Sequence, residues 1–243
     1  MPVSKRQKLA AAAARAAEEG EKDQQWEYSA PDIPTSHWVR RGLNEYCIEG
    51  MEWLLKNIKN DTCALRSGAC PEDIVIGGRD NFGDAMDPFV RHTVLPRDDA
   101  LLPHWKEYAT ALQICQGTTS CQTFSIRNMQ LPTSVSVLLA PALKDIRLIA
   151  FELDNNLNAM ECIDFAIEII ERNQSLEMFE WANNLAGPNT SRLVEAVLRH
   201  PLIDHVRLEN CFEEGENANA YGVLSSILAS NKQFSIIDFE GNN

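Results

Sequence analysis

The chain has 243 residues, of which 44% are hydrophobic, and its formal net charge is −13. This is enough apolar material for a substantial core. The sequence contains no run of roughly 18 apolar residues, the length that a membrane-spanning helix needs. From residue 145 onward, 17 acidic side chains face six basic ones. That balance argues against DNA or RNA as the main ligand.

Residues 1–30 form the first distinct segment. A short basic run, Lys5–Lys8, is followed by alanines and then by mixed charges, so we expect a disordered or partly helical arm. The run could be a weak nuclear import signal, although a solvated tail is favoured. The segment lacks the apolar centre of a secretory signal peptide, so we expect a cytoplasmic protein, with the nucleus as the alternative.

Residues 31–70 are interpreted as a helical N-terminal cap. Trp38–Cys47 and Met51–Ile58 together predict a helix whose apolar stripe covers the open end of a stack of repeats. Residues 71–120 are interpreted as a degenerate first repeat, with a strand over Pro71–Gly78 and a helix over Leu101–Leu112. Gly77 and Gly78 are expected at a turn, since the spacing of a phosphate loop is absent.

Residues 121–243 contain five copies of an apolar ladder. Each fits the pattern L-x-x-L-x-L-x-x-N/C of leucine-rich repeats, loosely in the first copy and with Asp closing the second. The copies are Cys121–Met129, Ile146–Asp154, Leu176–Asn184, Ile203–Cys211 and Phe234–Asn242. Their second apolar positions are separated by 25, 30, 27 and 31 residues and are Phe124, Ile149, Phe179, Val206 and Ile237.

Apolar residues at helical spacing follow the first four ladders, so each unit is predicted to be a strand, a turn and an amphipathic helix. One unit cannot bury its apolar face alone, and the units must therefore stack. The closing Asn can hydrogen-bond backbone groups that the turn leaves unpaired, and Cys211 is a small substitute. No helix follows the last ladder, so we expect either that a later segment has been lost or that the last strand has an exposed edge.

The alternation of strand and helix, the long period and the Asn or Cys closing position resemble the ribonuclease-inhibitor-like class of leucine-rich-repeat proteins. The resemblance covers residues 121–243. It implies a right-handed α/β horseshoe with parallel strands on the concave side and helices on the convex side, in an intracellular protein that binds other proteins. His104–Tyr108 and Glu209–Phe212 also resemble uncharacterised leucine-rich-repeat proteins of diatoms and related algae, which implies a lineage and no function.

The predicted strands place three rows of side chains on the concave surface, because outward positions alternate with core positions. The rows are Thr123, Leu148, Met178, His205, Ile236; Ser125, Ala150, Glu180, Arg207, Asp238; and Arg127, Glu152, Ala182, Glu209, Glu240. Apolar side chains flanked by charges suit a protein partner. The predicted protein-binding residues are Leu148, Glu152, Met178, Glu180, His205, Arg207, Glu209, Ile236, Asp238 and Glu240.

The sequence offers little for catalysis or metal binding. The seven cysteines are scattered and odd in number, which suggests reduced thiols. Cys63 and Cys70 lack the further ligands of a zinc site. His205 is predicted near Glu180 and Glu209, where a charge partner is commoner than a general base. We expect no cofactor and no metal.

These observations predict a non-enzymatic scaffold that presents an acidic and apolar surface to a protein with a basic patch, with no nucleic acid or membrane as ligand. Two alternatives stay open. One is a regulator that activates a small GTPase through residues at the strand ends, with candidates Arg127, Asn128, Asn183 and Asn210. The other is an actin-associated repeat domain.

Overall fold

The computed structural model describes residues 26–78, 93–114, 121–144, 146–156, 159–185, 189–212 and 217–242. The predicted basic run and most of the N-terminal arm lie outside these ranges. In the described part, six strands form one all-parallel sheet in chain order. They are β1 (Asp73–Gly77), β2 (Thr123–Arg127), β3 (Ala150–Asp154), β4 (Met178–Ala182), β5 (His205–Glu209) and β6 (Ile236–Asp238).

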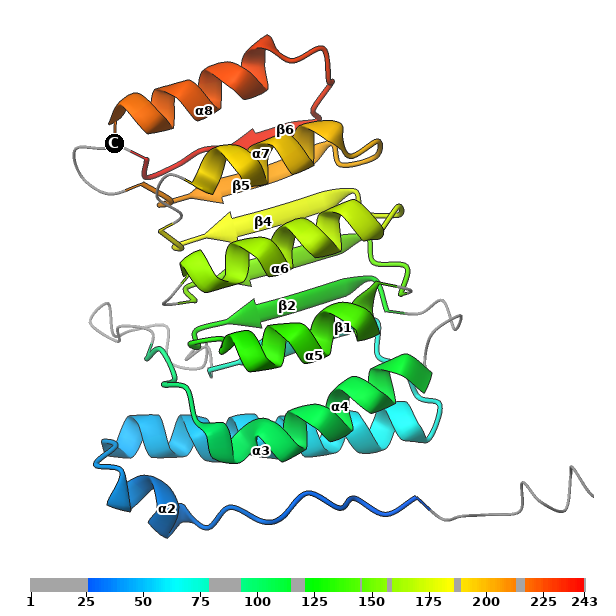
Figure 1. Cartoon of the computed structure of the whole chain (residues 1–243), viewed down its shortest axis with the longest axis vertical. Helices are drawn as coiled ribbons and strands as arrows, with labels where there is room; N and C mark the ends of the chain where they lie inside the picture. The colour runs from blue at the N-terminus through cyan, green and yellow to red at the C-terminus, as the bar shows by residue number, and fades with distance from the viewer. Residues whose placement is uncertain are drawn as a thin grey trace, which may run out of the picture.

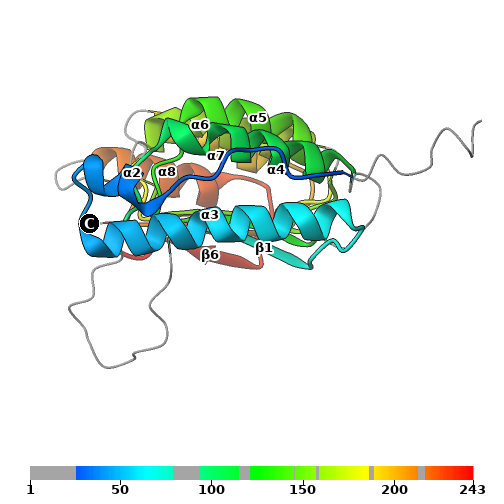
Figure 2. The same ribbon diagram turned by 90° about the horizontal axis from the view of Figure 1, so that it is seen from below.

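A helix follows each of the first five strands, and these helices lie together on one side of the sheet (Figures 1 and 2). They are α4 (Leu102–Ile114), α5 (Thr133–Leu143), α6 (Ala159–Arg172), α7 (Thr190–Arg199) and α8 (Asn217–Ala229). The predicted fold class, an α/β stack of repeated strand-helix units, is confirmed, and the sheet is open. None of the described helices is long and apolar enough to cross a membrane.

The register of the second unit was predicted wrongly. Phe151, not Ile149, pairs with Phe124 and Phe179, so the ladder is Leu148–Asn156. The aligned positions are then separated by 27, 28, 27 and 31 residues. Both frames fit the apolar pattern, but only the second places Asn rather than Asp in the closing position. The rings of Phe124, Phe151 and Phe179 are consequently neighbours in the core, with centroids 6.4 and 6.2 Å apart.

The closing residues contact backbone groups, as predicted, and the carbonyls they reach belong to the preceding unit. The Asn156 side-chain amide donates to the Met129 carbonyl at 3.0 Å, and that of Asn184 donates to the Leu153 carbonyl at 2.8 Å. Cys211 occupies the same position, with its sulfur 3.0 Å from the Trp181 carbonyl. These contacts satisfy backbone carbonyls that would otherwise be buried without partners.

The residue before each closing position has a left-handed backbone. The φ angles are 51°, 52°, 53° and 50° at Asn128, Asn155, Asn183 and Asn210. Asn tolerates this conformation better than other residues with a Cβ. At the end of β6, Gly241 takes the role with φ 73°.

A second set of contacts joins the units where each helix returns to its strand. The Asn173 side chain donates to the Ile146 carbonyl at 2.6 Å. One unit later, His200 Nε2 lies 2.8 Å from the Asn173 carbonyl, while its Nδ1 accepts from the Ile203 amide at 3.1 Å. Burial lowers the pKa of His200, in keeping with a neutral ring that uses both nitrogens.

The N-terminal cap consists of two helices rather than the one predicted. α2 (Thr35–Arg40) ends before Gly42, whose φ is 75°, and α3 (Glu45–Arg66) begins after Asn44, whose side chain accepts from the Cys47 amide at 2.8 Å. A left-handed glycine followed by an Asn N-cap interrupts a helix despite a continuous apolar stripe. α3 lies along α4 at the first end of the stack (Figure 1).

The predicted strand and helix of the first unit are both present. β1 pairs in parallel with β2, and α4 packs between α3 and α5. The glycines at the end of β1 reflect a close approach: a Cβ on Gly77 would lie 1.7 Å from the Arg127 carbonyl oxygen. With φ 146°, this position favours glycine on two grounds.

Leu208 is 1% exposed, so Leu208→Asp should unfold the protein. An unpaired buried carboxylate costs several kcal/mol against a total stability of roughly 5–15 kcal/mol. Leu228→Asp is the matched control, because Leu228 is 66% exposed. Thermal melts of the two variants test this, and a Leu208→Asp melt like that of the wild type would contradict the core assignment.

Cys162 and Cys211 are fully buried, whereas Cys63 is exposed. Burial raises the pKa of the Cys211 thiol, which further suppresses its reactive thiolate. In the folded protein, a thiol reagent should modify Cys63 rapidly and the two buried thiols slowly, and denaturant should abolish the difference. Mass spectrometry of partially modified protein would measure it; a disulfide at Cys162 or Cys211 would instead indicate an oxidising compartment.

Candidate functional site

The face of the sheet opposite helices α4–α8, here called the strand face, carries three rows of outward side chains. Strand pairing defines the first row as Asp73, Thr123, Ala150, Met178, His205 and Ile236. The second is Val75, Ser125, Glu152, Glu180, Arg207 and Asp238. The third is Gly77, Arg127, Asp154, Ala182 and Glu209, and Glu240 lies exposed just beyond β6.

Leu148 was predicted on this surface and is instead fully buried. It lies before β3, in the first apolar position of its unit, equivalent to Leu176 and Ile203, which are also buried. Ala150 occupies the place assigned to Leu148. Glu152 moves from the third row to the second, and Asp154 replaces it. One two-residue shift in register explains all three corrections.

The structure brings four of the predicted residues together around one guanidinium. Arg207 Nη1 lies 3.4 Å from a carboxylate oxygen of Glu180, and Nη2 lies 2.5 Å from one of Glu209. Arg207 Nε lies 3.2 Å from a carboxylate oxygen of Asp238. Its Nε faces Asp238 without the alignment of a hydrogen bond. One cation is thus shared by three carboxylates from three adjacent strands.

A second ion pair joins the neighbouring strands β2 and β3. Arg127 contacts Glu152 at 2.5 Å and also donates to the Ser125 hydroxyl at 2.8 Å. Glu152 and Glu180 are direct neighbours across β3 and β4, and they are only 8% and 5% exposed. Burial, and next the charge of Glu152, raise the pKa of Glu180, although Arg207 and Arg127 oppose this.

We call this group the strand-face cluster; it comprises Arg127, Glu152, Glu180, Arg207, Glu209 and Asp238. With every group ionised, it holds four carboxylates and two guanidinium groups. Beside it, Met178 is half-buried and Ile236 is 48% exposed, and His205 lies between them in the first row. The surface is therefore acidic with apolar side chains at its edge.

The strand ends carry the residues considered for GTPase regulation. Arg127 is held by Glu152, and Asn128 is 2% exposed. Asn155 donates to Asn128 at 2.8 Å, and Asn210 donates to Asn183 at the same distance. These asparagines have a structural part in linking successive units, which the sequence reading did not foresee.

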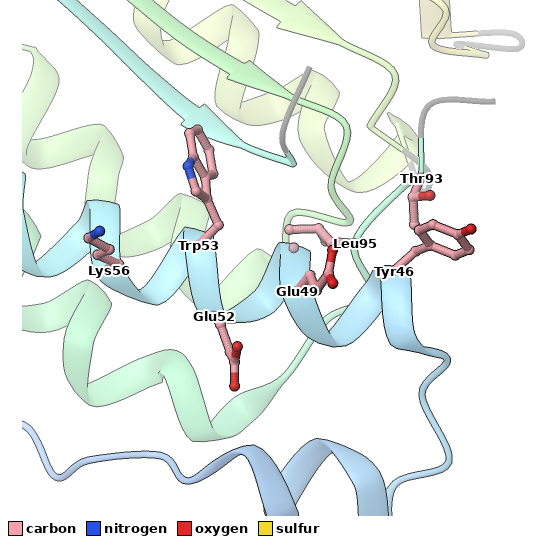
Figure 3. Close-up of a pocket in the computed structure, with 8 residues that line it drawn as sticks. Tyr46, Glu49, Glu52, Trp53, Lys56, Thr93 and Leu95 are labelled. Atoms are coloured by element: carbon pink, nitrogen blue, oxygen red, sulfur yellow. The ribbon is translucent and has the colours of Figure 1, made fainter. Parts of the chain in front are cut away.

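The described surface also has a hollow on α3 of about 420 Å³. Tyr46, Glu49, Trp53 and Leu95 are among its lining residues (Figure 3). In the close-up, Trp53 and Glu52 point in opposite directions from α3 and Lys56 lies further along the helix, so these three side chains do not converge. We therefore place the candidate site on the strand face.

Catalytic and metal-binding groups were sought in the described ranges. No group of three or more His, Cys, Asp or Glu side chains there is arranged to hold a metal ion. His205, the histidine placed on the strand face, pairs across the sheet with Met178 and Ile236.

The ion pairs and Val75 were missed by the sequence reading. Val75 is 44% exposed on the strand face, and the uncertain first unit had been left out of the predicted rows. The ion pairs of Arg207 could have been anticipated, since Arg207 and three acids fall in the same or adjacent predicted rows. The distances between their charged atoms, however, depend on the strand register, which only the structure gives. Comparison with models of known protein families and with curated proteins gives no match.

Replacing Arg207 with Leu should lower the free energy of unfolding by about 1–3 kcal/mol, because three carboxylates lose their shared cation in a partly buried setting. The loss should shrink at pH 4, because Glu180, whose pKa is raised by burial and by the charge of Glu152, takes up a proton more readily in the folded state than in the unfolded one. Arg192→Leu is the control, since the Arg192–Asp164 pair is more than half exposed. Urea titrations at pH 7 and pH 4 measure both effects; equal losses in the two variants would contradict the cluster's role.

Proposed function

We propose that the strand face binds another protein through a segment that carries basic and apolar side chains, and that the chain acts as a non-enzymatic scaffold. The observation that carries this proposal is the excess of carboxylates over guanidinium groups in the strand-face cluster, next to Met178 and Ile236. A partner Lys or Arg side chain would compensate this excess.

Electrostatics supports a basic partner. Glu152 and Glu180 are neighbouring carboxylates with little access to water, and a cation placed against them gains more than it would in bulk solvent. Such complementarity speeds encounter and fixes register more than it holds the complex. Met178 and Ile236 would supply apolar anchors that slow dissociation.

The shape of the site favours a protein over a small ligand. Small molecules are usually bound in enclosed hollows with a few convergent polar groups. The strand-face cluster instead extends over side chains from β2 to β6 of an open sheet. An extended surface of this kind suits a peptide or a protein domain.

We further propose that the units belong to the ribonuclease-inhibitor-like class of leucine-rich repeats. Support comes from the closing residues Asn156, Asn184 and Cys211, which bond neighbouring backbone. Helices of 10 to 14 residues between the strands also fit that class. An intracellular location is part of this proposal, in line with buried thiols that form no disulfide in the described residues.

A peptide-display selection on the whole chain tests the proposed partner chemistry. Selected segments should be enriched in Lys or Arg together with large apolar residues. Asp238→Asn/Glu240→Gln, which removes two strand-face charges, should enrich them less. A matched variant with two helix-side charges removed, Glu171→Gln/Glu195→Gln, should behave like the wild type. Selection of acidic segments, or equal selection by all three proteins, would overturn the proposal.

Kinetics with a selected peptide should separate the two kinds of contact. Asp238→Asn/Glu240→Gln should slow association by about threefold to tenfold at low salt and weaken its salt dependence. Met178→Ala/Ile236→Ala should speed dissociation by about tenfold or more. Surface plasmon resonance at two salt concentrations measures both rates.

Melting temperatures close to that of the wild type must accompany these changes, since Ile236 and Glu240 are exposed and Met178 and Asp238 are half-buried. Glu180 is left unchanged because it is 5% exposed and paired with Arg207.

The GTPase-regulator and actin-associated alternatives stay predictions. Stimulated GTP hydrolysis in a panel of small GTPases would favour the first, and co-sedimentation with actin filaments would favour the second. A GTPase effect that survives Asn183→Ala/Asn210→Ala, the exposed strand-end asparagines, would count against their assigned role.

A further inference from the structure

Residues 26–34, here called the strap, run in extended form along the outer side of α3 and α4 (Figures 1 and 2). Polar and aromatic contacts hold the strap to both helices. The Arg66 guanidinium lies 4.9 Å from the Trp26 ring centroid, and Lys59 Nζ lies 2.5 Å from the Asp32 carboxylate. The Ser29 hydroxyl donates to Glu107.

Tyr28 and His104 form the middle of this contact. The Tyr28 hydroxyl lies 2.7 Å from His104 Nδ1, and the two rings stack with centroids 5.7 Å apart. His104 is 0% exposed. Its other nitrogen, Nε2, is buried and makes no hydrogen bond among the described residues.

A proton on His104 would be unfavourable in this setting. The ring would carry a positive charge and two N–H donors in a site that water does not reach. The Tyr28 hydroxyl can turn to accept from Nδ1, so the cost comes from burial rather than from losing that bond. Burial, and next the charge of Lys59, lower the pKa of His104, although the Pro31 carbonyl, Asp32 and Glu107 act against this.

We propose that the strap is a proton-sensitive latch, which stays docked while His104 is neutral and is released as His104 takes up a proton. In the released state the ring meets water and regains its ordinary affinity for protons. Docking is therefore at full strength above about pH 6.5 and is lost as the pH falls below that value. The ratio of docked to released strap should fall between pH 7.5 and pH 5.5, by at most about tenfold.

Asp32, Tyr28 and Arg66 also lie at the contact, and they keep their charge states between pH 5.5 and pH 7.5. Lys59 lowers the pKa of Asp32 through a hydrogen bond and its charge, so Asp32 loses its charge only at more acidic pH. Burial raises the pKa of Tyr28, with further contributions from Glu107, Cys63 and Asp32. Arg66 faces the strap as a permanent cation.

Fluorine NMR of the full chain labelled with 5-fluorotryptophan tests the latch. Trp26→Phe identifies the strap resonance, and urea held below the main unfolding transition brings the released population into range at pH 7.5. His104→Asn keeps an acceptor for the Tyr28 hydroxyl but does not titrate, so its ratio should change less than twofold with pH. His205→Asn, which removes a histidine from the strand face, should keep the wild-type response.

A wild-type ratio that stays constant to pH 5.5, or an equal response in His104→Asn, would overturn the proposal. The resonance of the buried Trp181 reports whether each variant is folded, and His104→Gln replaces His104→Asn if the latter is not. Tyr28→Leu, at a half-buried position of the strap, provides a second test of the latch. It should lower the docked fraction at pH 7.5, and a fraction equal to that of the wild type would also overturn the latch.

Discussion

The backbone conformation and the hydrogen bonds at the end of each strand determine how successive units stack. Where the chain leaves the sheet, one residue adopts a left-handed conformation and the next sends its side chain to the backbone of the neighbouring unit. Asn183 and Asn184 show both roles, since Asn183 has φ 53° and Asn184 bonds the Leu153 carbonyl. The same two positions recur 27 residues later as Asn210 and Cys211. Because these contacts fix how one unit meets the next, the rows of the strand face depend on them.

Stacking units with the same sequence pattern also places like charges next to each other. Equivalent positions in adjacent strands lie side by side, so Glu152 and Glu180 are brought together although like charges across strands are destabilising. Arg127 and Arg207 offset this from either side. The excess of carboxylates that is left is costly for folding alone, and it is the feature that a basic partner would relieve. Local conflicts of this kind are expected at functional surfaces.

The apolar core is covered to different extents at the two ends of the stack. At the first end, α3, α2 and the strap cover the core, and Asp98 anchors α2 by accepting from the Trp38 indole at 2.9 Å and pairing with Arg41 at 2.7 Å. At β6, Ile237 is half-buried, whereas Val206 and Phe179 in the equivalent positions are 1% and 0% exposed. The covered end also encloses a titratable group, His104, against which the strap packs.

By itself, the sequence determined the strand-helix alternation, the buried ladder and the closing Asn or Cys, because these repeat at a regular spacing and each copy supports the others. It also placed Met178, His205, Arg207 and Ile236 in their rows. It did not determine the frame of the second unit, where Ile146 and Leu148 both fit the apolar pattern, and Leu148 was therefore misplaced. Only the tertiary structure decided that frame, since strand pairing aligns Phe151 with its neighbours. The same holds for the sharing of Arg207 among three acids and for the strap against His104. The acids around Arg207 follow the repeat spacing, but their distances depend on the register. The strap and His104 have no periodic relation in the chain, and only packing brings them within contact distance.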